Sequence, residues 1–161
     1  MFDRKNLDAL IDEFERAYDK ISAMVKSLSP EAMAFVPNLP DAWSINAHLV
    51  HLLDADCNMV MRVRGAVAEP GKLVPVWDAE AWQKYNRYNE SDGLAALNIA
   101  ISLRAFLAAS LRSLDDAALE AAHIIHPERG TLQLADVLKI YADHPAFHVE
   151  YVERNLSLLK K

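Results

Sequence analysis

The chain is poor in cysteine, glycine and clustered positive charge, and each shortage excludes a class of protein. Its one cysteine, Cys57, rules out an internal disulfide framework and suits a reducing compartment. Four glycines and seven prolines in 161 residues leave little room for disordered, low-complexity segments. No block of basic residues offsets the net charge of −6, so a nucleic-acid partner is not expected.

Uninterrupted hydrophobic runs of membrane-spanning length are also missing. The longest apolar stretch, residues 94–111, contains Asn98 and Arg104, which favours a buried helix over a membrane span. The first residues mix charges at once and lack the apolar segment of a signal peptide. We therefore expect a single domain over residues 1–161, located in the cytoplasm and not associated with a membrane.

Apolar residues recur at intervals of three and four along most of the chain, which is typical of amphipathic helices. A short extra helix, capped by Asp78, is expected in the connection between the second and third long helices. Residues 123–127 are expected to form an extended connection, and no convincing pair of strands is apparent. The long helices are predicted over 5–28, 43–68, 94–114 and from Thr131 onward. Together these elements predict an all-α bundle of four helices.

Two histidines four residues apart lie in the middle of the apolar stripe of the last predicted helix. His144 and His148 project about 40° from each other on a helical wheel, close enough to bind one ion. A buried imidazole needs hydrogen bonds or a metal, and for this pair alone hydrogen-bonded core histidines are the simpler interpretation. His51 in the second helix offers a third imidazole. Three such ligands suit zinc, nickel or iron and leave coordination positions open.

A line of polar residues follows His51 along the second helix. Asn58 and Arg62 project from the same side, and Asp54 lies one turn away. This line indicates either a cavity between close-packed helices or a solvated stripe. We predict that Asp54 accepts the free N–H of a metal-bound imidazole. Arg62 is predicted to bind an anionic group of the substrate, or else to be the charge partner of Asp54 or Asp56.

Further predictions concern the neighbours of these residues. His48, one turn before the candidate ligand of the second helix, is expected to have a supporting or packing role and not to bind the metal. Cys57 is expected to be a small buried residue. Trp77, Trp82 and Tyr85 are expected to form a packed cover on the core more than a ligand-binding box.

An ordered set of motifs runs between residues 40 and 150. The second helix carries Trp43-Ser44-Ile45, His51-Leu52-Leu53-Asp54 and Arg62. The loop that follows carries Pro70 and Trp77-Asp78-Ala79-Glu80-Ala81-Trp82. The last helix and its approach carry Gly130-Thr131-Leu132, Tyr141-Ala142, His144 and His148. Each motif alone is weak, but in this order the set resembles the DinB/YfiT-like family of metal-dependent enzymes.

This resemblance implies a DinB-like up-down-down-up four-helix bundle in which His51, His144 and His148 bind a divalent metal ion. Family members with assigned activities include S-transferases and an isomerase that use low-molecular-weight thiols, and many others carry only a hydrolase label. Dimers are common in the family, so a homodimer is expected. Pro145 departs from the pattern, and we expect it to disturb the helix between the two histidines.

The resulting hypothesis is a metal-dependent enzyme with a three-histidine site, either a thiol-dependent S-transferase or a hydrolase, that acts on a small molecule. The alternative is a non-catalytic dimeric helical bundle with a structural or vestigial metal site. Accessibility distinguishes the two, because a catalytic metal needs an open coordination position and a pocket. A structural zinc is normally closed by four protein ligands.

Overall fold

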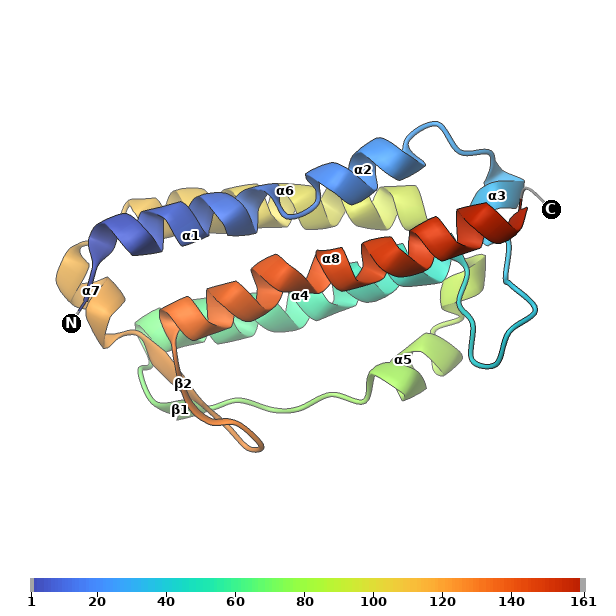
Figure 1. Cartoon of the computed structure of the whole chain (residues 1–161). Coiled ribbons are helices and arrows are strands. Elements are labelled where there is room, and N and C mark those ends of the chain that lie inside the picture. The colour runs from blue at the N-terminus through green and yellow to red at the C-terminus, as the bar shows by residue number, and fades with distance from the viewer. Residues whose placement is uncertain (1, 160–161) are drawn as a thin grey trace.

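Four long helical arms lie alongside one another in the computed structural model, which describes residues 2–159 (Figure 1). The arms are α1 (Arg4–Arg16) with α2 (Asp19–Val25), α4 (Ile45–Ala68), α6 (Gly93–Arg112) and α8 (Leu134–Leu159). In the view of Figure 1, the first arm runs from left to right, α4 and α6 run from right to left, and α8 returns from left to right. This order confirms the predicted up-down-down-up four-helix bundle.

The connection between α4 and α6 is long because both helices run in the same direction, so the chain must first return along the bundle (Figure 1). This return carries β1 (Lys72–Leu73), α5 (Ala79–Tyr85) and η1 (Tyr88–Glu90). The short helix predicted after Asp78 is confirmed as α5. The Asp78 carboxylate accepts a hydrogen bond from the amide of Ala81 at 2.9 Å and thereby caps the helix.

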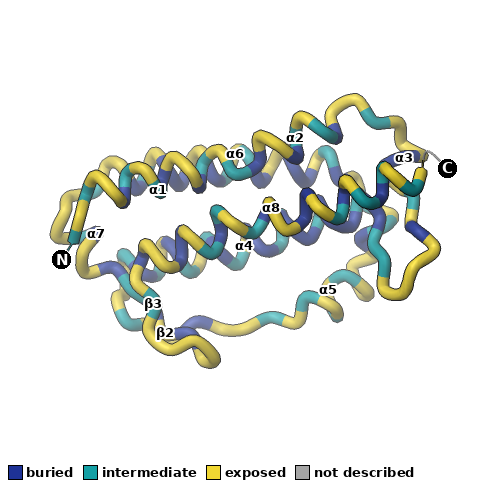
Figure 2. The backbone as a smooth tube through the Cα atoms, viewed as in Figure 1, coloured by how far each residue is buried: buried dark blue, intermediate teal, exposed yellow. Residues whose placement is uncertain are grey.

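The core lies between the arms, where the buried sides of the helices face one another (Figure 2). Helix α4 packs against α6 and α8, and α1 packs against α8 and α6. The apolar faces predicted from the three-and-four spacing point inward. Residues of these faces that are at most 1% exposed include Ile11, Phe14, Leu49, Leu52 and Leu107. The bundle therefore holds α4 and α8, the two histidine-bearing helices, side by side.

Within residues 2–159, one helix, α6, has the length and apolar composition that would allow it to cross a membrane. In the bundle its inner side packs into the core through residues such as Leu97, Ala100 and Leu107. Arg104, in the middle of the helix, is fully buried and forms an ion pair with Asp56 at 2.7 Å. These contacts agree with the prediction of a buried helix.

The single helix predicted over 5–28 is wrong in one respect, because it is interrupted at Ala17 and Tyr18 to give α1 and α2. Tyr18 is buried at the break, and its hydroxyl donates to the Asp56 carboxylate at 2.9 Å. A contact between residues so far apart is not encoded in local periodicity. A further short helix, α3 (Pro30–Ala34), was not predicted, although Ser29 caps it and proline occupies its first turn.

The expectation that the chain has no paired strands is also wrong. β2 (His123–His126) pairs in parallel with β1 and antiparallel with β3 (Gly130–Gln133), and the last helix starts at Leu134 and not at Thr131. Strands of two to four residues are too short to give a clear alternating pattern. The predicted end of α6 before Asp115 is confirmed, and Asp115 caps α7 (Asp116–Ala121).

Candidate metal centre

Three imidazoles meet where α4 passes α8. The candidate ligand nitrogens of His51, His144 and His148 all lie within 4.8 Å of one another. The Nε2 atom of His144 is 3.0 Å from Nε2 of His148 and 3.4 Å from Nε2 of His51. A tetrahedral ion with metal–nitrogen bonds of about 2.0–2.1 Å separates its ligand nitrogens by about 3.3 Å. The observed spacing therefore fits one shared ion.

Helix α8 supplies two of the three nitrogens because residues four apart lie one above the other on a helix. Pro145 lacks an amide hydrogen and cannot complete the helical hydrogen bond to Tyr141. The helix nevertheless continues without interruption from Leu134 to Leu159, and Pro145 is buried in it. The expected disturbance therefore does not take the His144 ring away from His148.

Burial lowers the pKa of every imidazole in this region. It lowers the pKa of His51 and His144 to about 4 and that of His148 to about 2, with the neighbouring histidines adding to the effect on His144 and His148. All three rings are thus neutral at pH 7 and have a lone pair to offer. The Nε2 atom of His144 has either one proton or one lone pair, so it cannot form good hydrogen bonds to both His51 and His148. A cation between the three nitrogens removes this conflict.

His48 contacts the Nδ1 side of His148, away from the Nε2 atom that faces His144. Its Nδ1 atom is 3.0 Å from Nδ1 of His148, and both rings are buried. If His148 binds a metal through Nε2, its Nδ1–H is free to donate to His48. The His48 ring also stacks on Tyr151, with 5.2 Å between ring centroids and 18° between planes. This position matches the predicted supporting role of His48.

The two other predicted site residues lie outside the histidine cluster. The Asp54 carboxylate accepts a hydrogen bond from the Tyr88 hydroxyl, and burial raises the pKa of Asp54. Arg62 donates to the Tyr141 hydroxyl at 3.0 Å and to the Pro75 carbonyl at 3.2 Å. The catalytic roles predicted for Asp54 and Arg62 stay predictions.

The alternative role of Arg62, as the charge partner of Asp54 or Asp56, is wrong, because Asp54 accepts from Tyr88 and Arg62 pairs with neither carboxylate. Asp56 pairs with Arg104 through two hydrogen bonds of 2.7 and 2.8 Å. The prediction that Cys57 is buried is also wrong, because its side chain lies on the exposed side of α4. Sequence reasoning treated Arg104 only as an interruption of an apolar run and missed its partner.

An open cavity of about 660 Å³ adjoins the cluster and is lined by His48, His51, His144 and His148. Its other lining residues include the aromatic Trp43, Phe147 and Tyr151 and the charged Glu80, Lys84 and Arg154. The Trp43 carbonyl accepts a hydrogen bond from Asn155 of α8 at 2.7 Å, which ties this wall to the histidine-bearing helix. The site thus combines a set of candidate metal ligands with space for a small molecule.

The predicted aromatic cover is correct for Trp77 and wrong for Tyr85. Trp77 packs against the core and stacks on His51, with 5.5 Å between centroids and 21° between planes. Trp82 makes an edge contact with Trp77 at 5.0 Å but is itself exposed. Tyr85 is 76% exposed and covers nothing in the core. The cover therefore protects His51 through Trp77 and leaves the cavity side of the cluster open.

Comparisons with known proteins bear on the family and the fold of the chain. The family model described as "DinB superfamily" matches residues 13–152. A protein of Bacillus licheniformis named "Putative metal-dependent hydrolase" is 22% identical over 151 residues, which cover 94% of this chain and 85% of that protein. A protein of Oceanobacillus iheyensis with the same kind of name is 24% identical over 110 residues, 68% of this chain. The match spans 63% of the length of the Oceanobacillus protein, less than two thirds.

A relative with a different name is the transcriptional regulator MraZ of Mycolicibacterium vanbaalenii, 32% identical over 98 residues, which cover 55% of this chain and 65% of that protein. Among solved structures, YfiT from Bacillus subtilis superposes on this chain with a TM-score of 0.83 at 20% sequence identity. The superposition covers 96% of this chain and 88% of the YfiT chain. YfiT is described as "a probable metal-dependent hydrolase with an unusual four-helix bundle topology". At this identity the likeness shows the fold.

Proposed function

Because the chain belongs to the DinB superfamily and gathers three imidazoles at the wall of an open cavity, we propose that it is a metal-dependent enzyme acting on a small molecule. His51, His144 and His148 hold a divalent ion, which the donor set allows to be zinc, nickel or iron. The bound ion supplies a Lewis acid and lowers the pKa of a water or thiol. The reaction is hydrolysis when the nucleophile is water and S-transfer to an electrophile when it is a low-molecular-weight thiol.

The observation that carries this proposal is the count of ligands. Among the described residues the cluster contains three candidate ligands, and His48 faces the far side of His148. A structural zinc site normally has four protein ligands, whereas a catalytic one leaves a position free. The geometry therefore favours a catalytic site over the alternative of a structural one.

The residues around the open side set what the cavity can accept. Trp43 and Tyr151 supply flat apolar surfaces that exclude water from a bound substrate. Arg154 lies over the Tyr151 ring at 4.9 Å and donates to the Asn155 side chain, so its guanidinium is held at the rim. We propose a substrate with an apolar or aromatic body.

Cobalt-substituted protein tests the choice of nucleophile. If the enzyme uses a thiol, cysteine or glutathione will add a sulfur-to-cobalt charge-transfer band, because a metal-bound thiol is deprotonated. Thiol consumption with an electrophilic acceptor will then require the metal. An unchanged spectrum across a panel of cellular thiols rejects S-transfer and leaves hydrolysis. A metal with no exchangeable water ligand would favour the non-catalytic bundle instead.

We expect His48 to support metal binding without being a ligand. The His48→Ala variant removes the group that faces Nδ1 of His148, and loss of such an outer partner typically weakens metal affinity about 10- to 100-fold. His48→Gln keeps a hydrogen-bond acceptor and should recover part of the loss. Metal-binding calorimetry measures both.

A matched control is His123→Ala, because His123 lies in β2 and its ring contacts the carbonyl of Ala121. This variant should bind metal like the wild type. An unchanged affinity in His48→Ala would show that the contact with His148 has no orienting role. A complete loss of the metal in that variant would make His48 a ligand.

The predicted homodimer, the cytoplasmic location and the absence of a nucleic-acid partner remain proposals. Helices α4 and α6 expose the large apolar side chains of Met61, Ile99 and Phe106, which a second copy would cover. The net charge of −6 argues against a nucleic-acid backbone.

A further inference from the structure

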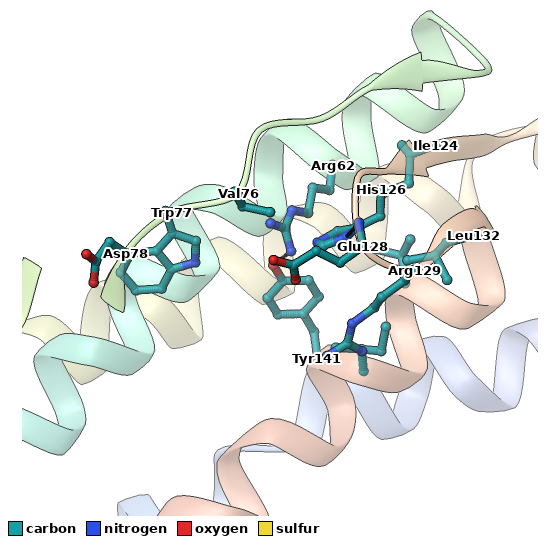
Figure 3. Close-up of a pocket in the computed structure, with 12 residues that line it drawn as sticks. Arg62, Val76, Trp77, Asp78, Ile124, His126, Glu128, Arg129, Leu132 and Tyr141 are labelled. Atoms are coloured by element: carbon teal, nitrogen blue, oxygen red, sulfur yellow. Dashed lines mark hydrogen bonds between the residues drawn. The ribbon is translucent and has the colours of Figure 1, made fainter. Parts of the chain in front are cut away.

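A second cavity, of about 500 Å³, lies beside Tyr141 of α8 and shares no lining residue with the histidine cavity (Figure 3). It is bounded by α4, α8, the β2–β3 hairpin and the segment after β1. Trp77 forms part of its wall and also stacks on His51, so this side chain stands between the two cavities. The second cavity is therefore separate from the histidine cavity and is lined by different side chains.

Arg62 provides positive charge inside this cavity. Its guanidinium donates to the Tyr141 hydroxyl at 3.0 Å and to the Pro75 carbonyl at 3.2 Å, both neutral acceptors. Within residues 2–159, Arg62 forms no ion pair with a carboxylate. A guanidinium has five N–H groups, so donors remain for a ligand once these two contacts are made. Tyr141 and Pro75 also hold the group in one place.

His126 adds a neutral donor to the same cavity. It is 7% exposed, and its Nδ1 atom accepts a hydrogen bond from the Glu128 amide at 3.2 Å. The ring proton therefore lies on Nε2. Burial and the nearby Arg62 lower the pKa of His126, which keeps the ring neutral at pH 7. Arg129 brings a second guanidinium to the rim (Figure 3).

The rest of the lining is largely apolar, with two carboxylates at its edge. The apolar lining residues are Val76, Ile124, Leu132, Val137 and Ile140. The Asp78 carboxylate is engaged as the cap of α5. Glu128 is exposed on the hairpin turn, and its carboxylate forms no hydrogen bond or ion pair within the described chain. The lining thus carries two guanidiniums and two carboxylates, and the Arg62 guanidinium belongs to a less exposed residue than either carboxylate.

We propose that this second cavity binds a small organic carboxylate with an apolar body. The carboxylate contacts the Arg62 guanidinium and the imidazole N–H of His126, and the body lies against the apolar wall. Arg129 attracts the ligand at the rim, and Glu128 repels it. This inference does not rest on the proposed metal chemistry, because His51, His144 and His148 do not line the cavity.

Benzoate is a suitable probe, with benzylamine as a control of opposite charge and benzyl alcohol as a neutral one. Metal-free, chelator-treated protein is titrated with each by calorimetry and by NMR. We expect benzoate to bind at millimolar concentration or better, and the two controls to bind at least about tenfold more weakly. Equal binding of the three probes, or no binding of benzoate, overturns the proposal.

Three variants locate the binding. Arg62→Gln should weaken benzoate binding by about tenfold or more, since a hydrogen bond to a charged group is lost. Glu128→Gln should strengthen it, and Arg129→Gln should weaken it by a smaller factor. The last two residues are exposed, so these variants decide the matter even if Arg62→Gln disturbs folding.

Two further variants separate this cavity from the metal site. Tyr141→Phe removes a partner of Arg62 but keeps the guanidinium, so benzoate binding should persist. His148→Ala should leave benzoate binding unchanged while it affects the metal. Benzoate binding that is lost in His148→Ala, or that shifts resonances of the histidine cavity instead, overturns the proposal.

Discussion

Replacement of His148 by alanine is expected to abolish stable divalent-metal binding, with affinity reduced by more than about 100-fold. The wild-type protein should hold about one ion per chain. His148 is a candidate ligand with a supporting contact, since its Nε2 lies 3.0 Å from that of His144 and its Nδ1 lies 3.0 Å from that of His48. Elemental analysis after dialysis and calorimetric titration of the metal measure the change. His51→Ala and His144→Ala should behave alike, and His123→Ala should not.

If the metal content per chain is undiminished in all three histidine variants, the proposed metal site is wrong. Stability provides a second readout, because a ligand that binds only the folded state at 100 times its Kd adds about 2.7 kcal/mol. This gain should be absent in His148→Ala. A thermal shift caused by zinc in that variant would indicate binding elsewhere.

Acid should act on the metal-free protein through the same histidines. Their pKa values in the folded chain, about 4 for His51 and His144, lie below the ordinary value of 6.5. The unfolded chain therefore takes up protons first as the pH falls. The stability due to neutral burial is present above about pH 6.5 and is lost as the pH falls toward 4, by up to about 1.4 kcal/mol per pH unit for each histidine.

The helices and the histidine pair were predictable because both depend on local spacing. The three-and-four periodicity placed α4, α6 and α8 to within a few residues, and the Asp78 cap located α5. The four-residue separation of His144 and His148 fixes their proximity on any helix. The up-down-down-up order came from the family resemblance, since periodicity does not determine how helices are arranged.

Features that depend on distant contacts were not predictable in the same way. β1 is two residues long, and its residues pair with residues 52 positions later in the chain, so no local pattern marks it. The contact of His48 with Nδ1 of His148 depends on how two helices are rotated toward each other. The second cavity brings Arg62 of α4 together with His126 of the β2–β3 hairpin, and that hairpin was not predicted from the sequence. Only the polar line through Arg62 suggested a lined cavity.

The stability of the bundle should be sensitive to the loss of either partner of the buried ion pair between Asp56 and Arg104. Both side chains are 0% exposed, and the Arg104 guanidinium donates two hydrogen bonds of 2.7 and 2.8 Å to the Asp56 carboxylate. Tyr18 donates to the same carboxylate, and the Phe14 carbonyl accepts from Arg104 at 3.2 Å. The guanidinium also lies 4.2 Å from the Tyr18 ring centre. The charges of the pair are thus compensated within the protein.

Removal of one partner, in Asp56→Leu or Arg104→Met, leaves the other as an uncompensated buried charge and should cost about 3–5 kcal/mol of unfolding free energy. Urea denaturation followed by circular dichroism measures this cost. The exposed pair of Lys20 and Glu153 offers a matched control, because its side chains are more than half exposed and its loss should have a much smaller effect.

The double variant Asp56→Leu with Arg104→Met shows how much of that cost comes from the unpaired buried charge and how much from lost packing. Replacing a buried ion pair with apolar residues of similar size is often neutral or stabilising, because the desolvation of both charges is then avoided. The double variant should therefore be more stable than either single variant. If the two single costs simply add, the large effect comes from lost packing around Tyr18 and Phe14 and not from an unpaired charge.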